Sequence, residues 1–339
     1  MEKLKLGVAY HGNRILKHIK EDMKDIVDHN MNLCVHMYTH NDMDRNKNLM
    51  KDIFSVTRDF GLDIWVDNWG IGGPPGDKSH FLQYSPESHR VMSDGKVSPV
   101  SVCFNSEAYV DFSKKWIDHV VEAGGDKLFW DEPHLEASPD GTFACCCPKC
   151  QKLFEERYNK KMPEKFNDDI LEFQAWTIGN YFAKVTKYAH EAGCENITCL
   201  MPHSLQFLKG VIDLPYISDI GTDPYWHYGR SNEPYKYVYE ISKPFMDEVK
   251  NHGKKTHIWL QAFDNRNGEE DEIYEAADAA YDAGARNIIA WSYRGGEAVD
   301  YKADACDIVW QVTGDAMRRI RDRFQNDVRA EYRKNMKLI

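Results

Sequence analysis

The segment DKLFWDEP, residues 126–133, carries the pattern that decides the fold. Its apolar run, residues 128–130, is typical of a buried strand, and two acids and a proline follow at once. Proline ends a strand readily because it has no N–H for the ladder. An apolar run that stops at polar groups predicts a parallel strand whose carboxyl end opens on a loop.

The same pattern recurs along the chain and alternates with helical segments. Eight apolar runs are typical of buried strands: KLGVAYH (5–11), NLCVHMYTH (32–40), LDIWVDNW (62–69), DKLFWDEP, NITCLMPH (196–203), SDIGTDPYW (218–226), THIWLQAF (256–263) and RNIIAWSY (286–293). Six intervening segments have apolar residues at helical spacing: 15–29, 49–61, 109–125, 170–193, 237–253 and 271–285. The connection over residues 204–217 is short. Eight such units predict an α/β fold of the (β/α)8 TIM barrel type, in a single domain over residues 1–339.

Composition narrows the class of partner. The chain has 339 residues and a net charge of −11 without a block of Lys or Arg, so no nucleic-acid partner is expected. Residues 1–22 lack the apolar core of a signal peptide, and no apolar window is long enough to span a membrane. We therefore expect a cytoplasmic protein with no membrane partner, and a homo-oligomer is left open.

The carboxyl ends of the eight runs supply the candidate site, because barrel enzymes hold their chemistry there. Aromatic rings beside carboxylates and amides suit a carbohydrate, whose C–H faces pack on rings while its hydroxyls need polar partners. A small carbohydrate substrate and no organic cofactor are therefore predicted. The residues predicted to bind it are His11, Tyr38, Asp67, Trp69, His203, Tyr225, Trp226, Gln261, Trp291 and Arg294.

Nine cysteines in a reducing compartment make a tight cysteine cluster a metal candidate. CCCPKC, residues 145–150, has a C-x-C-x2-C spacing, and one more cysteine stands upstream. Four thiolates complete a tetrahedral structural zinc site. The predicted ligands are Cys103, Cys145, Cys147 and Cys150, although Cys146 and a neighbouring cysteine could equally exchange roles, in an inserted zinc-binding loop around residues 136–165.

Two acids at the end of the fourth strand, DPYW after the sixth and a Trp after the eighth resemble the barrel glycoside hydrolases of clan A. The cysteine framework resembles that of the family 42 β-galactosidases. The resemblance implies that Glu132 is the general acid/base of a glycosidase. Because the chain shows no export signal, a short oligosaccharide or glycoside is the expected substrate. We expect an apolar surround and the neighbouring charge of Asp131 to keep Glu132 protonated.

Two departures from the clan A pattern leave the second catalytic group open. Asp131 stands where that pattern has Asn, and Gln261 stands where it has the nucleophilic Glu. Asp223 or Asp67 can supply the second carboxylate. Alternatively, the substrate supplies its own nucleophile and Asp131 orients it, since the Asp-Glu pair is similar to that of family 20 hexosaminidases. A third alternative is a barrel that only binds sugar.

A different class of enzyme also fits some of the strand-end residues. Imidazoles and carboxylates on separate strands are ordinary metal ligands in barrels. A metal-dependent sugar isomerase or aldolase would draw its ligands from His11, His36, His40, His134 and His203.

Overall fold

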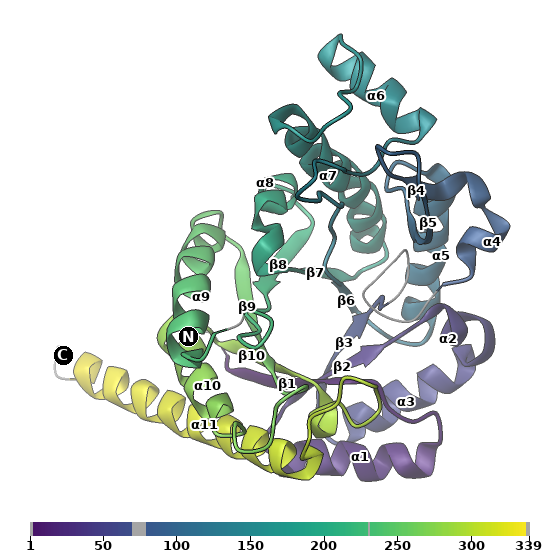
Figure 1. The fold of residues 1–339 in the computed structure, drawn as a ribbon. Helices are drawn as coiled ribbons and strands as arrows, with labels where there is room; N and C mark the ends of the chain where they lie inside the picture. Colours follow the sequence, from purple (N-terminus) through teal and green to yellow (C-terminus); the bar gives the residue numbers. More distant parts are fainter. Residues whose placement is uncertain (1–2, 70–78, 230, 337–339) are drawn as a thin grey trace. The chain divides into compact units, whose positions relative to one another are not determined.

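The computed structural model describes residues 3–69, 79–229 and 231–336 (Figure 1). The chain divides into two compact units. Unit 1 consists of Met1–His36, Asp52–Ile64 and Gly221–Ile339, and unit 2 consists of Met37–Lys51 and Trp65–Ile220.

The strands close into a parallel barrel in the order β1-β10-β9-β8-β7-β6-β3-β2 (Figure 1). They are β1 (Lys5–Tyr10), β2 (Leu33–Met37), β3 (Asp63–Asp67), β6 (Lys127–Trp130), β7 (Glu195–Leu200), β8 (Ile217–Thr222), β9 (Lys255–Gln261) and β10 (Asn287–Trp291). Each of the eight predicted runs matches one of these strands, although β7, β8 and β9 begin one residue before their runs. The prediction of a (β/α)8 TIM barrel is therefore confirmed.

Burial and register explain how the strands position polar groups. Every residue of β2 and β10 is buried, as expected of strands covered on both faces. In unit 1, Val8 of β1 pairs with Cys34 of β2 and with Ala290 of β10. In unit 2, Asp67 at the end of β3 pairs with Phe129 of β6. The residues that follow these strands therefore emerge at the same edge of each part of the sheet.

The helices between the strands form where the apolar spacing predicts them. They are α1 (Leu16–Asp28), α3 (Lys47–Asp59), α5 (Glu107–Glu122), α7 (Asp168–Glu191), α9 (Pro234–Asn251) and α10 (Glu272–Asp282). At the start of α5, the Ser106 hydroxyl accepts a hydrogen bond of 3.2 Å from the Tyr109 backbone N–H, which satisfies one free donor of the first turn. At its end, Gly124 adopts a φ of 89°, a conformation that glycine takes without strain.

The structure adds elements that the sequence pattern does not predict. They are α2 (His40–Arg45), α4 (Phe81–Tyr84), η1 (Pro86–Ser88), the hairpin of β4 (His89–Val91) and β5 (Val97–Val102), α6 (Pro148–Tyr158), η3 (Tyr293–Gly296) and α11 (Cys306–Met336). The short connection over 204–217 contains η2 (Pro202–Phe207) and α8 (Leu208–Val211). Helix α6 lies within the predicted loop over residues 136–165. Among the helices that the structure describes, none combines the length and the apolar character needed to cross a membrane.

Candidate functional site

Three carboxyl groups gather at the ends of two neighbouring strands of unit 2. Asp67 is the last residue of β3, and Asp131 and Glu132 directly follow β6. The Asp67 side chain is fully buried, and the Oδ2 atom of Asp131 is buried without a hydrogen-bond partner among the described residues. A buried carboxyl oxygen that lacks a donor favours the protonated form or awaits a polar ligand.

The charges in this cluster raise the pKa values of two of its members. Burial raises the pKa of Asp67 well above its usual range, and the charges of Asp131 and Glu132 raise it further. Burial and the charge of Glu132 likewise raise the pKa of Asp131. The repulsion between Asp131 and Glu132 is mutual, so the expectation that Asp131 keeps Glu132 protonated stays a prediction. The three carboxyl groups titrate as one coupled cluster that shares its protons.

The backbone at Glu132 explains how two consecutive acids can serve one cluster. Side chains on a regular strand alternate between its faces, which would separate Asp131 from Glu132. Strand β6 ends at Trp130, and Glu132 has a φ of 34°, so the alternation stops there. Trp130 itself points away from the acids: its ring packs 5.3 Å from that of Trp116 in α5, and its indole N–H donates to Asn196.

Other predicted residues of unit 2 lie around this cluster. The backbone N–H of Tyr38 donates to the Asp67 carbonyl oxygen at 2.9 Å. Tyr38, which directly follows β2, therefore lies beside Asp67 at the carboxyl ends of the strands. His134 Nδ1 lies 2.8 Å from the Glu132 carbonyl oxygen. Burial and the charge of Arg90 lower the pKa of His134, and a charge on His203 lowers it further. Trp69, two residues after β3, is buried.

Unit 1 contains a cavity of about 360 Å³ at the ends of β1 and β10. It is lined by His11, Gly12, Asn13, Asp22, Ser292, Tyr293, Arg294, Glu297 and Ala298. Two predicted binding residues, His11 and Arg294, thus line one cavity. Burial lowers the pKa of His11 to about 4, so its ring is neutral at neutral pH and can both donate and accept hydrogen bonds. The Arg294 guanidinium is held by Glu297 and Asp307.

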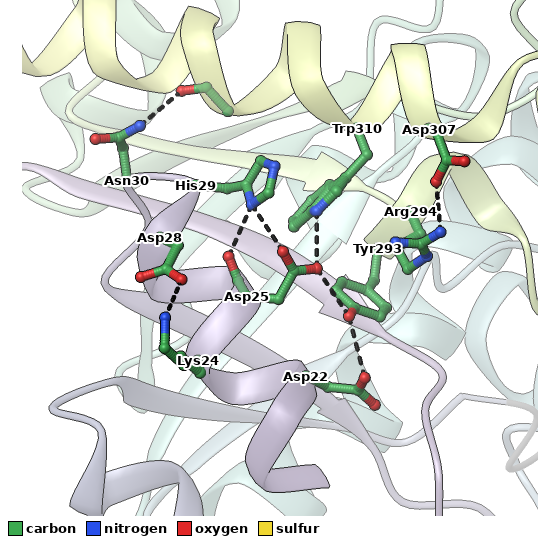
Figure 2. Close-up of polar contacts among 11 residues, drawn as sticks. Asp22, Lys24, Asp25, Asp28, His29, Asn30, Tyr293, Arg294, Asp307 and Trp310 are labelled. Atoms are coloured by element: carbon green, nitrogen blue, oxygen red, sulfur yellow. Dashed lines mark hydrogen bonds and ion pairs between the residues drawn. The ribbon is translucent and has the colours of Figure 1, made fainter. Parts of the chain in front are cut away.

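Asp22 on α1 is a lining residue that the sequence analysis did not predict. Its carboxylate accepts hydrogen bonds from the hydroxyls of Tyr10 (2.5 Å) and Tyr293 (3.1 Å) and from the side-chain amide of Asn13 (2.9 Å). Behind it, Asp25 accepts from Tyr293 and from the indole N–H of Trp310 (Figure 2). In the sequence, an aspartate inside a helix is expected to face solvent. Only Tyr10 at the end of β1 and Tyr293 after β10 could have indicated that Asp22 faces the cavity.

Aromatic rings stand beside this cavity at the end of β10. The ring of Trp291 meets that of His11 edge to face at 4.8 Å and that of Trp259 at 5.7 Å. Trp291 is only 8% exposed, so most of its surface is covered by these neighbours. Its assignment as the ring that stacks on a sugar stays a prediction.

The remaining predicted residues of unit 1 follow β8 and β9. Asp223 is buried. The pKa of Tyr237 is raised mainly by burial of its own ring and further by the charge of Asp223. Tyr225 packs 5.2 Å from Phe263, and Trp226 is fully buried with its indole N–H donating to Glu272 at 2.6 Å. The roles of Asp223, Tyr225 and Trp226 stay predictions.

The side-chain amide of Gln261, at the end of β9, forms hydrogen bonds with other residues of the chain. Its Oε1 accepts a hydrogen bond from the His227 backbone N–H at 3.1 Å, and its Nε2 donates to the Phe263 carbonyl oxygen at 3.2 Å. The side chain is fully buried. The amide therefore joins the segments that follow β8 and β9, and its predicted contact with a substrate stays a prediction.

The four predicted cysteines form one buried cluster in unit 2. The sulfur atoms of Cys103, Cys145, Cys147 and Cys150 all lie within 4.8 Å of one another. Cys103 Sγ lies 3.7 Å from that of Cys147 and 3.4 Å from that of Cys150. Four thiolates bound to zinc at about 2.3 Å stand about 3.8 Å apart, so the cluster fits this ion.

The surroundings of the cluster also agree with metal ligation. The side-chain amide of Asn105 donates to Cys150 Sγ at 3.3 Å, an outer contact that orients a thiolate. Cys146 does not join the group, and burial raises the pKa of its thiol to about 12. Cys103 directly follows β5 and Cys150 lies in α6, so the cluster connects the hairpin to that helix.

The five histidines considered for a catalytic metal are dispersed. His36 Nε2 lies 2.9 Å from the Thr57 hydroxyl on α3, and the ring of His40 stacks on that of His80 at 3.7 Å. His11 and His36 belong to unit 1, whereas His40, His134 and His203 belong to unit 2. Within residues 3–69, 79–229 and 231–336, no metal-compatible group contains two of these five.

No protein family model and no curated protein sequence matches the chain. Solved structures do match its fold. The catalytic domain of a β-amylase from Paenibacillus polymyxa is 9% identical with a TM-score of 0.65, over 91% of this chain and 97% of that one. An endo-1,4-β-mannanase from Rhizomucor miehei is 10% identical with a TM-score of 0.64, over 94% and 95%. An endo-β-1,4-mannanase from Thermotoga petrophila is 9% identical with a TM-score of 0.58, over 94% and 77%. The chain therefore shares the (β/α)8 barrel fold of these glycoside hydrolases.

Proposed function

We propose that this chain is a glycoside hydrolase that acts on a short oligosaccharide or glycoside. One observation carries the proposal: Asp67, Asp131 and Glu132 interact at the ends of β3 and β6, where barrel enzymes hold their catalytic groups. Glycoside hydrolysis needs one carboxyl group that gives a proton and one that carries a charge. A cluster that shares protons among three carboxyl groups supports both roles.

In the proposed mechanism Glu132 is the general acid/base. Burial and mutual repulsion raise the pKa values of Asp67 and Asp131, so the cluster shares protons and Glu132 can hold the one that it donates. As a sugar enters and excludes water, a proton from this cluster reaches the leaving oxygen. The second group is the carboxylate of Asp67 or Asp223, or the substrate supplies its own nucleophile and Asp131 orients it.

The cavity of unit 1 supports binding of a polar, uncharged ligand. Its volume of about 360 Å³ is within the ~300–1,000 Å³ typical of small-molecule sites. The lining combines an acceptor carboxylate at Asp22, a neutral imidazole at His11 and the amide of Asn13. Hydroxyl groups pair with each of these, whereas an anionic ligand would meet the charges of Asp22 and Glu297.

We further propose that Cys103, Cys145, Cys147 and Cys150 hold a structural zinc ion, as the resemblance to family 42 implies. All four thiolates would be ligands, which leaves no position for a water molecule or a substrate. The ion would hold the hairpin β4–β5 against α6 and would take no part in the chemistry.

A second candidate function is sugar binding without hydrolysis. It is favoured by Gln261, which stands where clan A enzymes have the nucleophilic Glu and whose amide is engaged with His227 and Phe263. An amide cannot form a glycosyl ester.

A panel of aryl glycosides, including N-acetylhexosaminides, separates the two candidates. The hydrolase predicts release of the aryl group from at least one sugar, and the binding protein predicts none. Isothermal titration with the corresponding oligosaccharides then shows whether a protein that fails to hydrolyse still binds.

A further inference from the structure

Three ligand-type side chains converge between the segment after β8 and the start of α10, within unit 1. They are His227, Glu269 and Glu272, and one ligand atom from each lies within 4.8 Å of the other two. His227 Nε2 lies 3.0 Å from an oxygen of Glu272 and 3.5 Å from one of Glu269. The imidazole is 16% exposed and the carboxylates are 25% and 39% exposed, so solvent reaches the group from one side.

The other ring nitrogen of His227 fixes the tautomer. Nδ1 lies 3.2 Å from the carbonyl oxygen of Asp264, which can only accept a hydrogen bond. Nδ1 therefore carries a hydrogen. In a neutral ring with the hydrogen on Nδ1, the lone pair of Nε2 would face the carboxylate oxygens of Glu269 and Glu272. These electron pairs would repel one another. A positive species must stand between Nε2 and these oxygens, and it is either a proton or a metal ion.

The backbone and an indole hold these groups in place independently of such an ion. The His227 N–H donates to Gln261 Oε1 at 3.1 Å, and Trp226 Nε1–H donates to Glu272 Oε2 at 2.6 Å. Metal-binding histidines commonly donate their second ring N–H to a carbonyl oxygen, as His227 does to Asp264. The side chains are thus oriented in advance of binding.

We propose that His227, Glu269 and Glu272 form a binding site for a divalent first-row metal ion such as Zn²⁺. Zinc bonds of about 2.0–2.1 Å to nitrogen and oxygen place neighbouring ligand atoms about 3.3 Å apart, and the two N–O distances of 3.0 and 3.5 Å bracket that value. Three protein ligands leave one position for water or a substrate oxygen, unlike the four-cysteine cluster. The ion ties the segment after β8 to the start of α10, and the proposal does not depend on glycosidase activity.

Zinc bound per chain, measured by equilibrium dialysis and elemental analysis, tests the site. Wild type, His227→Gln, Glu269→Gln and Glu275→Gln are compared after circular dichroism has shown that each is folded. Glu275 is the matched control, because it is an exposed acid one turn along α10 from Glu272 and outside the group. The cysteine cluster is present in all four proteins, so only differences between them are interpreted.

The proposal predicts that His227→Gln and Glu269→Gln each bind one zinc ion fewer than wild type, whereas Glu275→Gln binds the same number. Zinc should also raise the Tm of wild type more than that of His227→Gln, because an ion that binds only the folded state stabilises it. Equal zinc content in wild type, His227→Gln and Glu269→Gln would overturn the proposal and leave a protonated His227 paired with two carboxylates.

Discussion

Among single residues, the proposed catalysis depends on how protons are shared in the cluster of Asp67, Asp131 and Glu132. The sequence predicted Asp131 and Glu132 from their place after an apolar run, and Asp67 from its strand end. It could not predict that the three groups form one coupled cluster, which depends on the positive φ of Glu132 and on the full burial of Asp67. Asp22 was missed because nothing in a helical pattern distinguishes an aspartate that faces a cavity.

The raised pKa of Asp67 predicts a pH dependence of stability. A carboxyl group whose folded pKa lies above its unfolded value stabilises the fold at low pH, and this contribution is lost as pH rises through the folded pKa. Asp67→Asn removes the titration. The free energy of unfolding of the wild type should therefore fall relative to that of the variant above about pH 4, by up to about 1.4 kcal/mol per pH unit. Urea unfolding from pH 4 to 8 measures the difference, and a constant difference would contradict the assignment.

Asp25, on the same helix as Asp22, allows the stability contribution of a partly buried hydrogen-bond acceptor to be measured. Burial acts to raise its pKa, but hydrogen bonds from His29, Tyr293 and Trp310 outweigh burial and lower it (Figure 2). The folded state therefore favours the carboxylate. Asp25→Asn should cost about 1–3 kcal/mol of unfolding free energy at pH 7 in urea titrations, because it leaves donors imperfectly paired.

Asp28 provides the control for this comparison, since it is on the same helix and pairs with Lys24 at the surface, with both side chains more than half exposed. Asp28→Asn should cost ~0–1 kcal/mol. Equal losses for Asp25→Asn and Asp28→Asn would show that the Asp25 contacts contribute no more than a surface ion pair.

At the scale of elements, the sequence predicted all eight barrel strands and six of the helices, because apolar spacing marks buried faces directly. Helix α11 was missed. Its buried residues, which include Val309, Trp310 and Met317, lie in its first half, and its second half is exposed and highly charged, so the helical pattern fades. The hairpin β4–β5 was not predicted. Its strands have three and six residues with exposed or half-buried positions, so they lack a clear run of apolar residues.

The insertion with α6 is where the cysteine cluster should contribute most to stability. Cys147→Ser removes a proposed zinc ligand and should abolish zinc binding at the cluster and lower the Tm, because ligation and local folding are coupled. Cys146→Ser is the matched control one residue away and should keep both the zinc and the Tm. Elemental analysis and thermal unfolding measure the two effects. Zinc loss in Cys146→Ser with retention in Cys147→Ser would reverse the ligand assignment.

At the scale of the whole molecule, the barrel could be predicted because strand and helix patterns alternate along nearly the entire chain. A fold shared with a β-amylase and two mannanases at 9–10% identity agrees with that prediction. Function was harder to predict, since a barrel hosts many reactions and only the groups at its strand ends distinguish them. Gln261 illustrates this. The sequence identifies an amide in place of an acid, but only the structure shows that this amide is hydrogen-bonded to the backbone of His227 and Phe263.

If Glu132 protonates the leaving group of a glycoside, then its loss should slow substrates according to how much protonation their leaving groups need. The measurement is kcat/KM of wild type and Glu132→Gln on two substrates with the same sugar, a natural-type oligosaccharide and an aryl glycoside with an acidic leaving group. For Glu132→Gln we expect kcat/KM to fall by a factor of about 10²–10⁴ on the oligosaccharide. The fall should be smaller on the aryl glycoside, because its leaving group needs little protonation. Full activity of Glu132→Gln on both substrates would contradict this role of Glu132.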